Sequence, residues 1–243
     1  MKIRRMKIAC VSLRGGCAAG TLPAFMPSQA LVGEIALIVV PVLAAIVFHE
    51  VAHGAVAFAL GDPTAARAGR LTLNPIPHID PVGTVLLPGL LMLAPLLFGT
   101  RPFIFGWAKP VPVDFRQLRH PRRDSILVAL AGPTTNLILA ALSALVLAAL
   151  PLTTDPTSLI RAVALMAVAS IQVNCLLAVF NLLPVPPLDG GRVLSALLPL
   201  RLAYLLSRVE KIGYLIVLLV VFNTGLLGIL SRPVMAFFLG WAR

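Results

Sequence analysis

The chain has 243 residues, of which 59% are hydrophobic and only 12% are charged, and its mean hydropathy is +0.97. Soluble domains are roughly 45–50% apolar and about 25% charged, so the excess of apolar residues must face lipid. The same composition excludes a disordered chain, a disulfide scaffold and a nucleic-acid-binding module. The net charge of +11 therefore indicates basic loops beside anionic lipid, and we expect a lipid bilayer as partner and no nucleic acid.

Residues 1–30 differ from the rest of the chain. Met1 to Lys7 is basic, like the start of a signal peptide, but Arg14 interrupts the apolar run that follows Cys10. The segment therefore matches neither a clean signal sequence nor a good transmembrane helix. We expect a basic leader of uncertain order in residues 1–30, followed by one membrane-embedded unit in residues 31–243.

The apolar stretches predict an all-α multi-pass membrane protein, because a helix needs about 20 mostly apolar residues to cross the hydrocarbon layer. Gly83–Gly99 is marginal in length and contains Pro88 and Pro95, so it either spans with a kink or enters and returns on one side. Val193–Leu200 is too short to cross and is expected to form a half-helix. We expect a bundle of about five to six transmembrane helices with a broken helix and a re-entrant segment. The stretches long enough to span are Leu31–Leu60, Ile126–Leu150, Leu159–Leu182 and Ile212–Leu230.

Residues 49–53 read His-Glu-Val-Ala-His inside the first apolar stretch. Residues four apart on a helix are offset by about 6 Å on nearly the same face, so His49 and His53 can hold one metal ion. Glu50 then lies beside the metal, where it can take a proton from metal-bound water. Ionisable groups inside a membrane cost about 2.5–3.5 kcal/mol each on insertion scales, which argues against a purely structural origin of this motif.

Catalytic zinc usually has three protein ligands, so a third one must be found. Asp189 follows a stretch in which an apolar helix meets Pro184, Pro186 and Pro187, which prevent the helix from continuing. Broken helices at membrane depth are tolerated where they line a polar cavity, which suits a metal ligand. Asp189 would equally serve as the cap of a short helix, and spacing alone leaves both interpretations open.

The motif at His49–His53, together with the run from Asn181 to Gly190, resembles the site-2 protease family of intramembrane zinc metalloproteases. The resemblance extends from about residue 31 to about residue 215, with its motifs in the same order. We expect a minimal form of the family, without a PDZ or a nucleotide-sensing domain. Further similar stretches are residues 69–75 with His78, Asp80 and Pro81, residues 105–113, and residues 131–136.

The resemblance implies that His49, His53 and Asp189 bind one Zn²⁺ ion and that Glu50 is the general base. It implies a metalloendopeptidase that cleaves transmembrane segments of membrane proteins, with residues 31–243 as its catalytic domain and a membrane-protein helix as its substrate. We expect the protein in the plasma membrane. A membrane zinc hydrolase with a lipid-linked, non-peptide substrate remains an alternative, as does a non-enzymatic zinc-binding scaffold, although a scaffold has no use for Glu50.

Two asparagines in apolar stretches, Asn181 and Asn136, are candidate substrate contacts. The plain explanation for each is a hydrogen bond between helices; for Asn181 we favour contact with the substrate, and for Asn136 we favour packing. The pair Gly132-Pro133 predicts a close helix approach or a kink next to Asn136. His78, in a proline-rich loop, either supports the metal site from behind its ligands or is a solvated loop residue, and we favour the solvated residue.

The orientation of the first span follows from the ligand set. Ligands of one ion cannot lie near opposite faces of the membrane, and Asp189 is close to Arg192 and Arg201, which the positive-inside rule places in the cytoplasm. We therefore expect Leu31–Leu60 to run from outside to inside, with residues 61–82 and 116–123 cytoplasmic and with Gly83–Val113 entering and leaving on that side. This orientation requires an outside N-terminus or an extra crossing before residue 31. The stretch Pro102–Val113 fits either a surface loop or an exposed strand edge that pairs with an unwound substrate.

Overall fold

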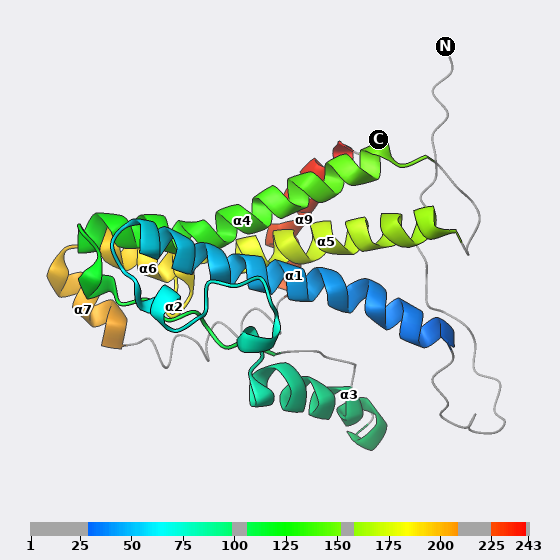
Figure 1. The fold of residues 1–243 in the computed structure, drawn as a ribbon, viewed down its shortest axis with the longest axis horizontal. Helices are drawn as coiled ribbons and strands as arrows, with labels where there is room; N and C mark the ends of the chain where they lie inside the picture. The colour runs from blue at the N-terminus through cyan, green and yellow to red at the C-terminus, as the bar shows by residue number, and fades with distance from the viewer. Residues whose placement is uncertain (1–28, 99–105, 152–157, 209–224, 242–243) are drawn as a thin grey trace, which may run out of the picture.

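The computed structural model describes residues 29–98, 106–151, 158–208 and 225–241, and within these ranges it is helical with no strand (Figure 1). The helical fold class predicted from the sequence is confirmed. In chain order, the elements are α1 (Gln29–Ala59), α2 (Thr64–Arg67), η1 (Ile76–His78), η2 (Pro81–Leu86), α3 (Leu87–Phe98), η3 (Phe115–Gln117), α4 (Pro121–Ala149), α5 (Leu159–Asn181), α6 (Asp189–Leu197), α7 (Leu200–Arg208) and α9 (Leu226–Gly240).

Among the described residues, three helices are long and apolar enough to cross a membrane, namely Leu37–Ala59 within α1, the whole of α4 and the whole of α5. They correspond to three of the four predicted spans, and they make the chain an integral membrane protein. The fourth predicted span, Ile212–Leu230, lies mostly outside the described residues, and its last residues belong to α9. The total of five to six spans stays a prediction.

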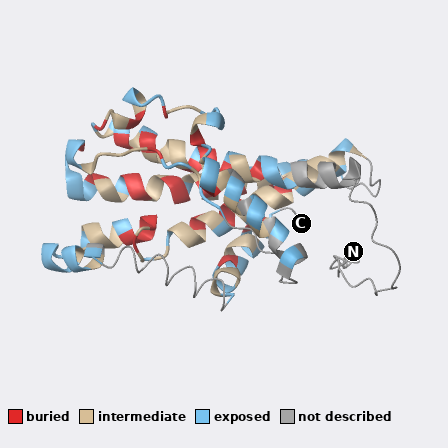
Figure 2. Ribbon diagram, turned by 90° about the horizontal axis from the view of Figure 1, so that it is seen from below, coloured by how far each residue is buried: buried red, intermediate tan, exposed pale blue. Residues whose placement is uncertain are grey.

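The helices pack through small side chains, with α4 lying against both α1 and α5. Ala45 of α1 and Ala140 and Ala144 of α4 are fully buried. The larger Ile138 and Leu142 of α4 are more than half exposed. Figure 2 shows the buried residues gathered where the helices face one another. This is the packing expected in lipid, where large apolar residues gain nothing by leaving the hydrocarbon and small residues let the backbones approach.

The turn after α1, the short helices α2, α6 and α7, and the start of α4 all lie at one end of the bundle (Figure 1). The fully buried Asp62 holds two segments of this end together. Its carboxylate accepts hydrogen bonds from the backbone N–H of Thr64 at 2.9 Å and of Asp114 at 2.7 Å, and from the Thr64 hydroxyl. The turn after α1 is thus joined to the segment that leads into α4.

Between these two segments the chain leaves the bundle along η2 and α3 and returns at residues 106–107. The N–H of Trp107 donates to the carbonyl of Gly83 at 3.1 Å, and the Thr84 hydroxyl donates to the carbonyl of Trp107 at 2.8 Å. A Cβ at Gly83 would overlap the indole of Trp107. The two ends of this excursion are therefore held together, and residues 106–114 then run without helix or strand.

The predicted half-helix Val193–Leu200 differs from the observed one. Helix α6 begins four residues earlier, at Asp189, and ends at Leu197, after which α7 begins at Leu200. The proline-containing residues 182–188 are not helical. A Cβ at Gly190 would lie 2.5 Å from the carbonyl oxygen of Leu183, so only glycine lets this turn fold back against the start of α6. The earlier start was missed because the glycines after Asp189 are poor helix formers.

Candidate metal centre

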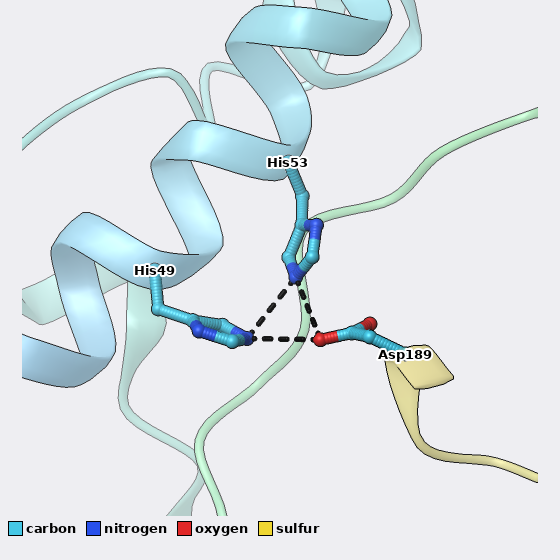
Figure 3. A group of neighbouring side chains, drawn as sticks. All are labelled: His49, His53 and Asp189. Carbon is cyan, nitrogen blue, oxygen red and sulfur yellow. Dashed lines mark hydrogen bonds and ion pairs between the residues drawn. The ribbon is translucent and has the colours of Figure 1, made fainter. Parts of the chain in front are cut away.

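Three side chains from two distant parts of the sequence converge at one point (Figure 3). His49 and His53 project from one face of α1, and Asp189 projects from the first turn of α6. The two Nε2 atoms are 3.0 Å apart, and each lies 3.3 Å from Oδ2 of Asp189. The structure thus brings together the three residues that were expected to share one ion.

The outer nitrogens of both imidazoles face oxygen acceptors. Nδ1 of His49 lies 2.5 Å from Oδ1 of Asn136, and Nδ1 of His53 lies 2.7 Å from the carbonyl oxygen of Val128. Nδ1 must carry the proton in both rings, so in the neutral rings both Nε2 atoms present lone pairs. Oδ2 of Asp189 is buried without a hydrogen-bond partner. Three electron-rich atoms therefore face one another, which is favourable only around a cation.

The donor set and its spacing fit zinc. Zinc in proteins is usually tetrahedral, with ligand bonds of about 2.0–2.2 Å to histidine nitrogen and carboxylate oxygen, which separates neighbouring ligand atoms by roughly 3.3 Å. The three observed separations are 3.0, 3.3 and 3.3 Å. Two imidazoles and one carboxylate also match catalytic sites, in which a fourth position is left for water or substrate.

Asp189 is not the cap of α6. It is the first residue of the helix, and the capping position belongs to Leu188, which makes no side-chain capping bond. The capping interpretation that the sequence left open is therefore wrong. The Asp189 carboxylate faces the two histidines.

Glu50 lies beside the group formed by His49, His53 and Asp189 and is not a member of it. Its Oε2 accepts a hydrogen bond of 2.7 Å from the backbone N–H of Val111. The segment that carries Val111 is also held by Arg70, which donates to the carbonyl of Lys109 at 2.7 Å and to that of Pro110 at 3.3 Å. Glu50 thus faces a fixed stretch of backbone next to the candidate metal centre.

His78 helps to hold the same segment, and its predicted solvated position is wrong. The residue is only 2% exposed. Its Nε2 lies 2.9 Å from the carbonyl of Thr72, and its own carbonyl accepts from the N–H of Lys109 at 2.9 Å. The loop was expected to be solvated because its prolines and polar residues are typical of surface turns. The sequence does not show that this loop packs against residues 106–114.

Helix α4 closes the centre from another side. A Cβ at Gly132 would overlap Nε2 of His53 and lie 2.6 Å from Cε1 of His49. The close helix approach predicted from Gly132-Pro133 is confirmed. Only a glycine at this position lets α4 lie directly against both imidazoles.

Asn136, one turn along α4, is fully buried and orients His49. Its amide nitrogen donates to the carbonyl of Ala45 at 3.2 Å and to Oδ1 of Asn174 at 2.8 Å, which fixes the orientation of the amide. Its role as a substrate contact stays a prediction, and its observed partners are those of a residue that positions a histidine.

The hydrogen-bonded chain continues through α5, in residues that sequence reasoning missed. The amide nitrogen of Asn174 donates to the carbonyl and hydroxyl oxygens of Ser170 at 2.9 and 3.1 Å, and the Ser143 hydroxyl donates to that of Ser170 at 2.8 Å. Asn174 could have been found as a polar residue seven positions before Asn181, on the same helix face. Asn181 itself is half-buried and donates to the carbonyl of Leu177 at 3.0 Å, and its contact with substrate stays a prediction.

An apolar helical bundle that buries a His-His-Asp group beside a glutamate defines a membrane-embedded metal hydrolase. Comparison with known proteins gives the family. The model of "Peptidase family M50" matches residues 153–223, which include Asp189. The chain is 40% identical over 195 residues to "Putative zinc metalloprotease YwhC" of Bacillus subtilis, covering 78% of this chain and 81% of that one. It is 28% identical over 220 residues to "Putative zinc metalloprotease Rip2" of Mycolicibacterium smegmatis, covering 90% and 79% of the two chains.

No solved structure matches the chain. The chain belongs to peptidase family M50, the site-2 proteases, and is a zinc metalloprotease.

Proposed function

We propose that this protein is an endopeptidase that cleaves transmembrane segments of membrane proteins inside the lipid bilayer. The observation that carries the proposal is the position of the His49, His53 and Asp189 group, which is built on a membrane-spanning helix and closed by α4. A peptidase centre enclosed among apolar helices suits substrates that are themselves apolar helices.

The residues of the chain divide the chemistry among them. His49, His53 and Asp189 would hold the zinc ion, which when bound would polarise a peptide carbonyl and make water acidic near neutral pH. Glu50 would accept the proton of the attacking water and pass it to the leaving amine. Asn136 and the Val128 carbonyl keep both imidazoles in the tautomer that offers Nε2 to the metal.

A substrate helix must unwind before its peptide bonds can react, and the extended residues 106–114 lie where an unwound strand would pass Glu50. One edge of this segment is already occupied, because Trp107, Lys109 and Val111 each use their N–H. The other edge offers the N–H of Ala108 but lacks donors at Pro110 and Pro112. Pairing with the substrate would therefore rest on few backbone hydrogen bonds, and Asn181 is the candidate for an additional contact.

The end of the bundle that carries the centre faces the cytoplasm in this proposal. Among the described residues, most arginines belong to segments at this end. Arg161, in the first turn of α5 at the opposite end, and Arg232, within α9, do not (Figure 1). The hydrogen bonds between Trp107 and residues 83–84 support an excursion of residues 83–107 that enters and leaves on the same side. The proposal includes five to six spans with a re-entrant segment, and it places the protein in the plasma membrane. The arginines at the basic end are Arg67, Arg70, Arg116, Arg119, Arg122, Arg123, Arg192, Arg201 and Arg208.

Purified protein incubated with a panel of single-pass membrane helices in liposomes tests the proposal, with lipid-linked amides and esters as the alternative substrates. We expect cleavage of at least one helix by the wild type. Glu50→Gln should retain zinc and lose at least the 10²- to 10⁴-fold in turnover typical of a lost general base. Asp189→Ala should lose both zinc and activity. Hydrolysis of a lipid-linked amide alone would overturn the protease, and near wild-type turnover of Glu50→Gln would overturn the mechanism.

A further inference from the structure

A cleft outside the metal centre lies at the basic end of the bundle, between the first turn of α4 and the outer side of α6. Its volume is about 450 Å³, within the range of about 300–1,000 Å³ that is usual for small-molecule sites. Its charged and polar lining comes from Arg122 and Ser125 of α4 and from Arg192 and Ser195 of α6, and its apolar lining includes Phe115 and Leu200. No acidic residue lines it.

The two arginines keep their positive charge uncompensated. The Arg192 guanidinium lies over the Phe115 ring, 5.3 Å from its centroid, and no carboxylate lies within ion-pair distance of it among the described residues. Arg122 donates to the carbonyl of Ala196 at 2.9 Å and to that of Leu198, which fixes its position at the end of α6 without neutralising it. The hydroxyls of Ser125 and Ser195 donate to the carbonyls of Arg122 and Gly191 in their own helices, so the guanidinium groups are the charged donors of the cleft. Two guanidinium groups in one cleft form a site for an anion with several oxygen acceptors.

The surroundings of the cleft are those of the membrane interface. The cleft is lined by Pro121 and Arg122, the first residues of the spanning helix α4, and by Leu200, the first residue of α7. The rim of the cleft is apolar, because Leu200, which lines it, is 74% exposed, and Leu197, next to the lining residue Ala196, is 67% exposed. Helix α7 continues this pattern with exposed Leu202 and Leu205 between Arg201 and Arg208, as in a helix that lies in the interface plane.

We propose that this cleft binds the phosphate headgroup of an anionic phospholipid from the cytoplasmic leaflet. Arg122 and Arg192 hold the phosphate, the hydroxyls of Ser125 and Ser195 lie within the same cleft, and the acyl chains lie along the exposed leucines of the rim. A free phosphate ion would make no contact with the apolar rim, whereas the acyl chains of a lipid would cover it. We therefore assign the site to a lipid. Because Arg192 lies one turn after Asp189 on α6, the bound lipid also fastens the helix that carries the candidate metal ligand.

Native mass spectrometry of the full-length protein tests the site. The protein is equilibrated with equal amounts of phosphatidylglycerol and phosphatidylcholine with the same acyl chains, and the retained lipids are counted. Wild type should retain phosphatidylglycerol in preference to phosphatidylcholine. Arg192→Gln should lower this preference about fivefold, the effect of one interfacial charge, and Arg192→Lys should keep most of it.

Two further variants keep the test decisive. Ser125→Glu places an acid in the cleft while both arginines stay, and it should lower the preference as Arg192→Gln does. Arg161→Gln removes an exposed charge at the opposite end of the bundle and should change nothing. An unchanged preference in Arg192→Gln and Ser125→Glu, or an equal loss in Arg161→Gln, would overturn the site. Displacement of the lipid by inorganic phosphate as effectively as by a short-chain phosphatidylglycerol would overturn its assignment to a lipid.

Discussion

Replacing Asn136 by leucine is expected to weaken zinc binding although none of the three converging side chains is changed. The amide oxygen of Asn136 is the partner of Nδ1 of His49 at 2.5 Å, and its nitrogen is bonded to Ala45 and Asn174. Asn136→Leu removes the oxygen that keeps the His49 ring in the Nδ1–H tautomer and leaves a buried donor unpaired. Loss of such an outer partner typically costs 10- to 100-fold in metal affinity, or about 1.4–2.7 kcal/mol.

The hydrogen-bonded chain supplies its own controls. Asn174→Leu removes one partner of Asn136 and leaves the bond to His49, so its effect on zinc should be smaller. Ser143 is the last member of this series of hydrogen bonds and is separated from Asn136 by Asn174 and Ser170. The variant Ser143→Ala should therefore bind zinc as wild type does. Zinc affinity is measured on the purified proteins by competition with a chromophoric chelator at pH 7. Zinc binding by Asn136→Leu within twofold of wild type would refute the reasoning, and so would an equal loss in Ser143→Ala.

Three further predictions concern the same end of the molecule. The added methyl group of Gly132→Ala would overlap both imidazoles, so this variant should lower the zinc content at least tenfold. Gly228→Ala, whose methyl group would meet open space, should keep the wild-type zinc content, and elemental analysis measures both. Removal of zinc with EDTA should lower the melting temperature of wild type and leave that of Asp189→Ala unchanged, because only the folded wild type binds the ion tightly. Asp62→Ala leaves the N–H groups of two segments without an acceptor at a cost of about 1–3 kcal/mol each, so its melting temperature should fall while its zinc affinity stays at the wild-type value.

The sequence predicts what is local in this protein. The spans α1, α4 and α5 follow from the length of apolar stretches, and the convergence of His49 and His53 follows from the geometry of one helix turn. Asp189 could be singled out because the prolines before it break an apolar helix. In each case the prediction depends on a few neighbouring residues.

What the sequence does not predict is which helix faces meet. A polar Asn136 in an apolar stretch predicts an interhelical hydrogen bond, but nothing in the sequence identifies His49, 87 positions earlier, as its partner. The same holds for Asn174, which was missed, and for His78, whose burial depends on residues 106–114 crossing it. Such pairs require the packing angles of several helices, and apolar residues all round a membrane helix do not show which side is inside.

The geometry also connects metal binding with the docking of α6. Helix α6 approaches α1 through Asp189, and without a cation the contact places a carboxylate oxygen 3.3 Å from two nitrogen lone pairs. This arrangement is repulsive for the metal-free neutral histidines, so part of the free energy of zinc binding is used to hold α6 in place. Helices α1 and α4, in contrast, meet through Gly132 and Asn136 and need no ion for their packing. Helix α6 also packs against α4, where Arg122 donates to the carbonyl of Ala196. The bundle is therefore expected to form without the ion, with zinc adding the link between α6 and α1, which is why chelation should lower the melting temperature of wild type without abolishing the helical fold.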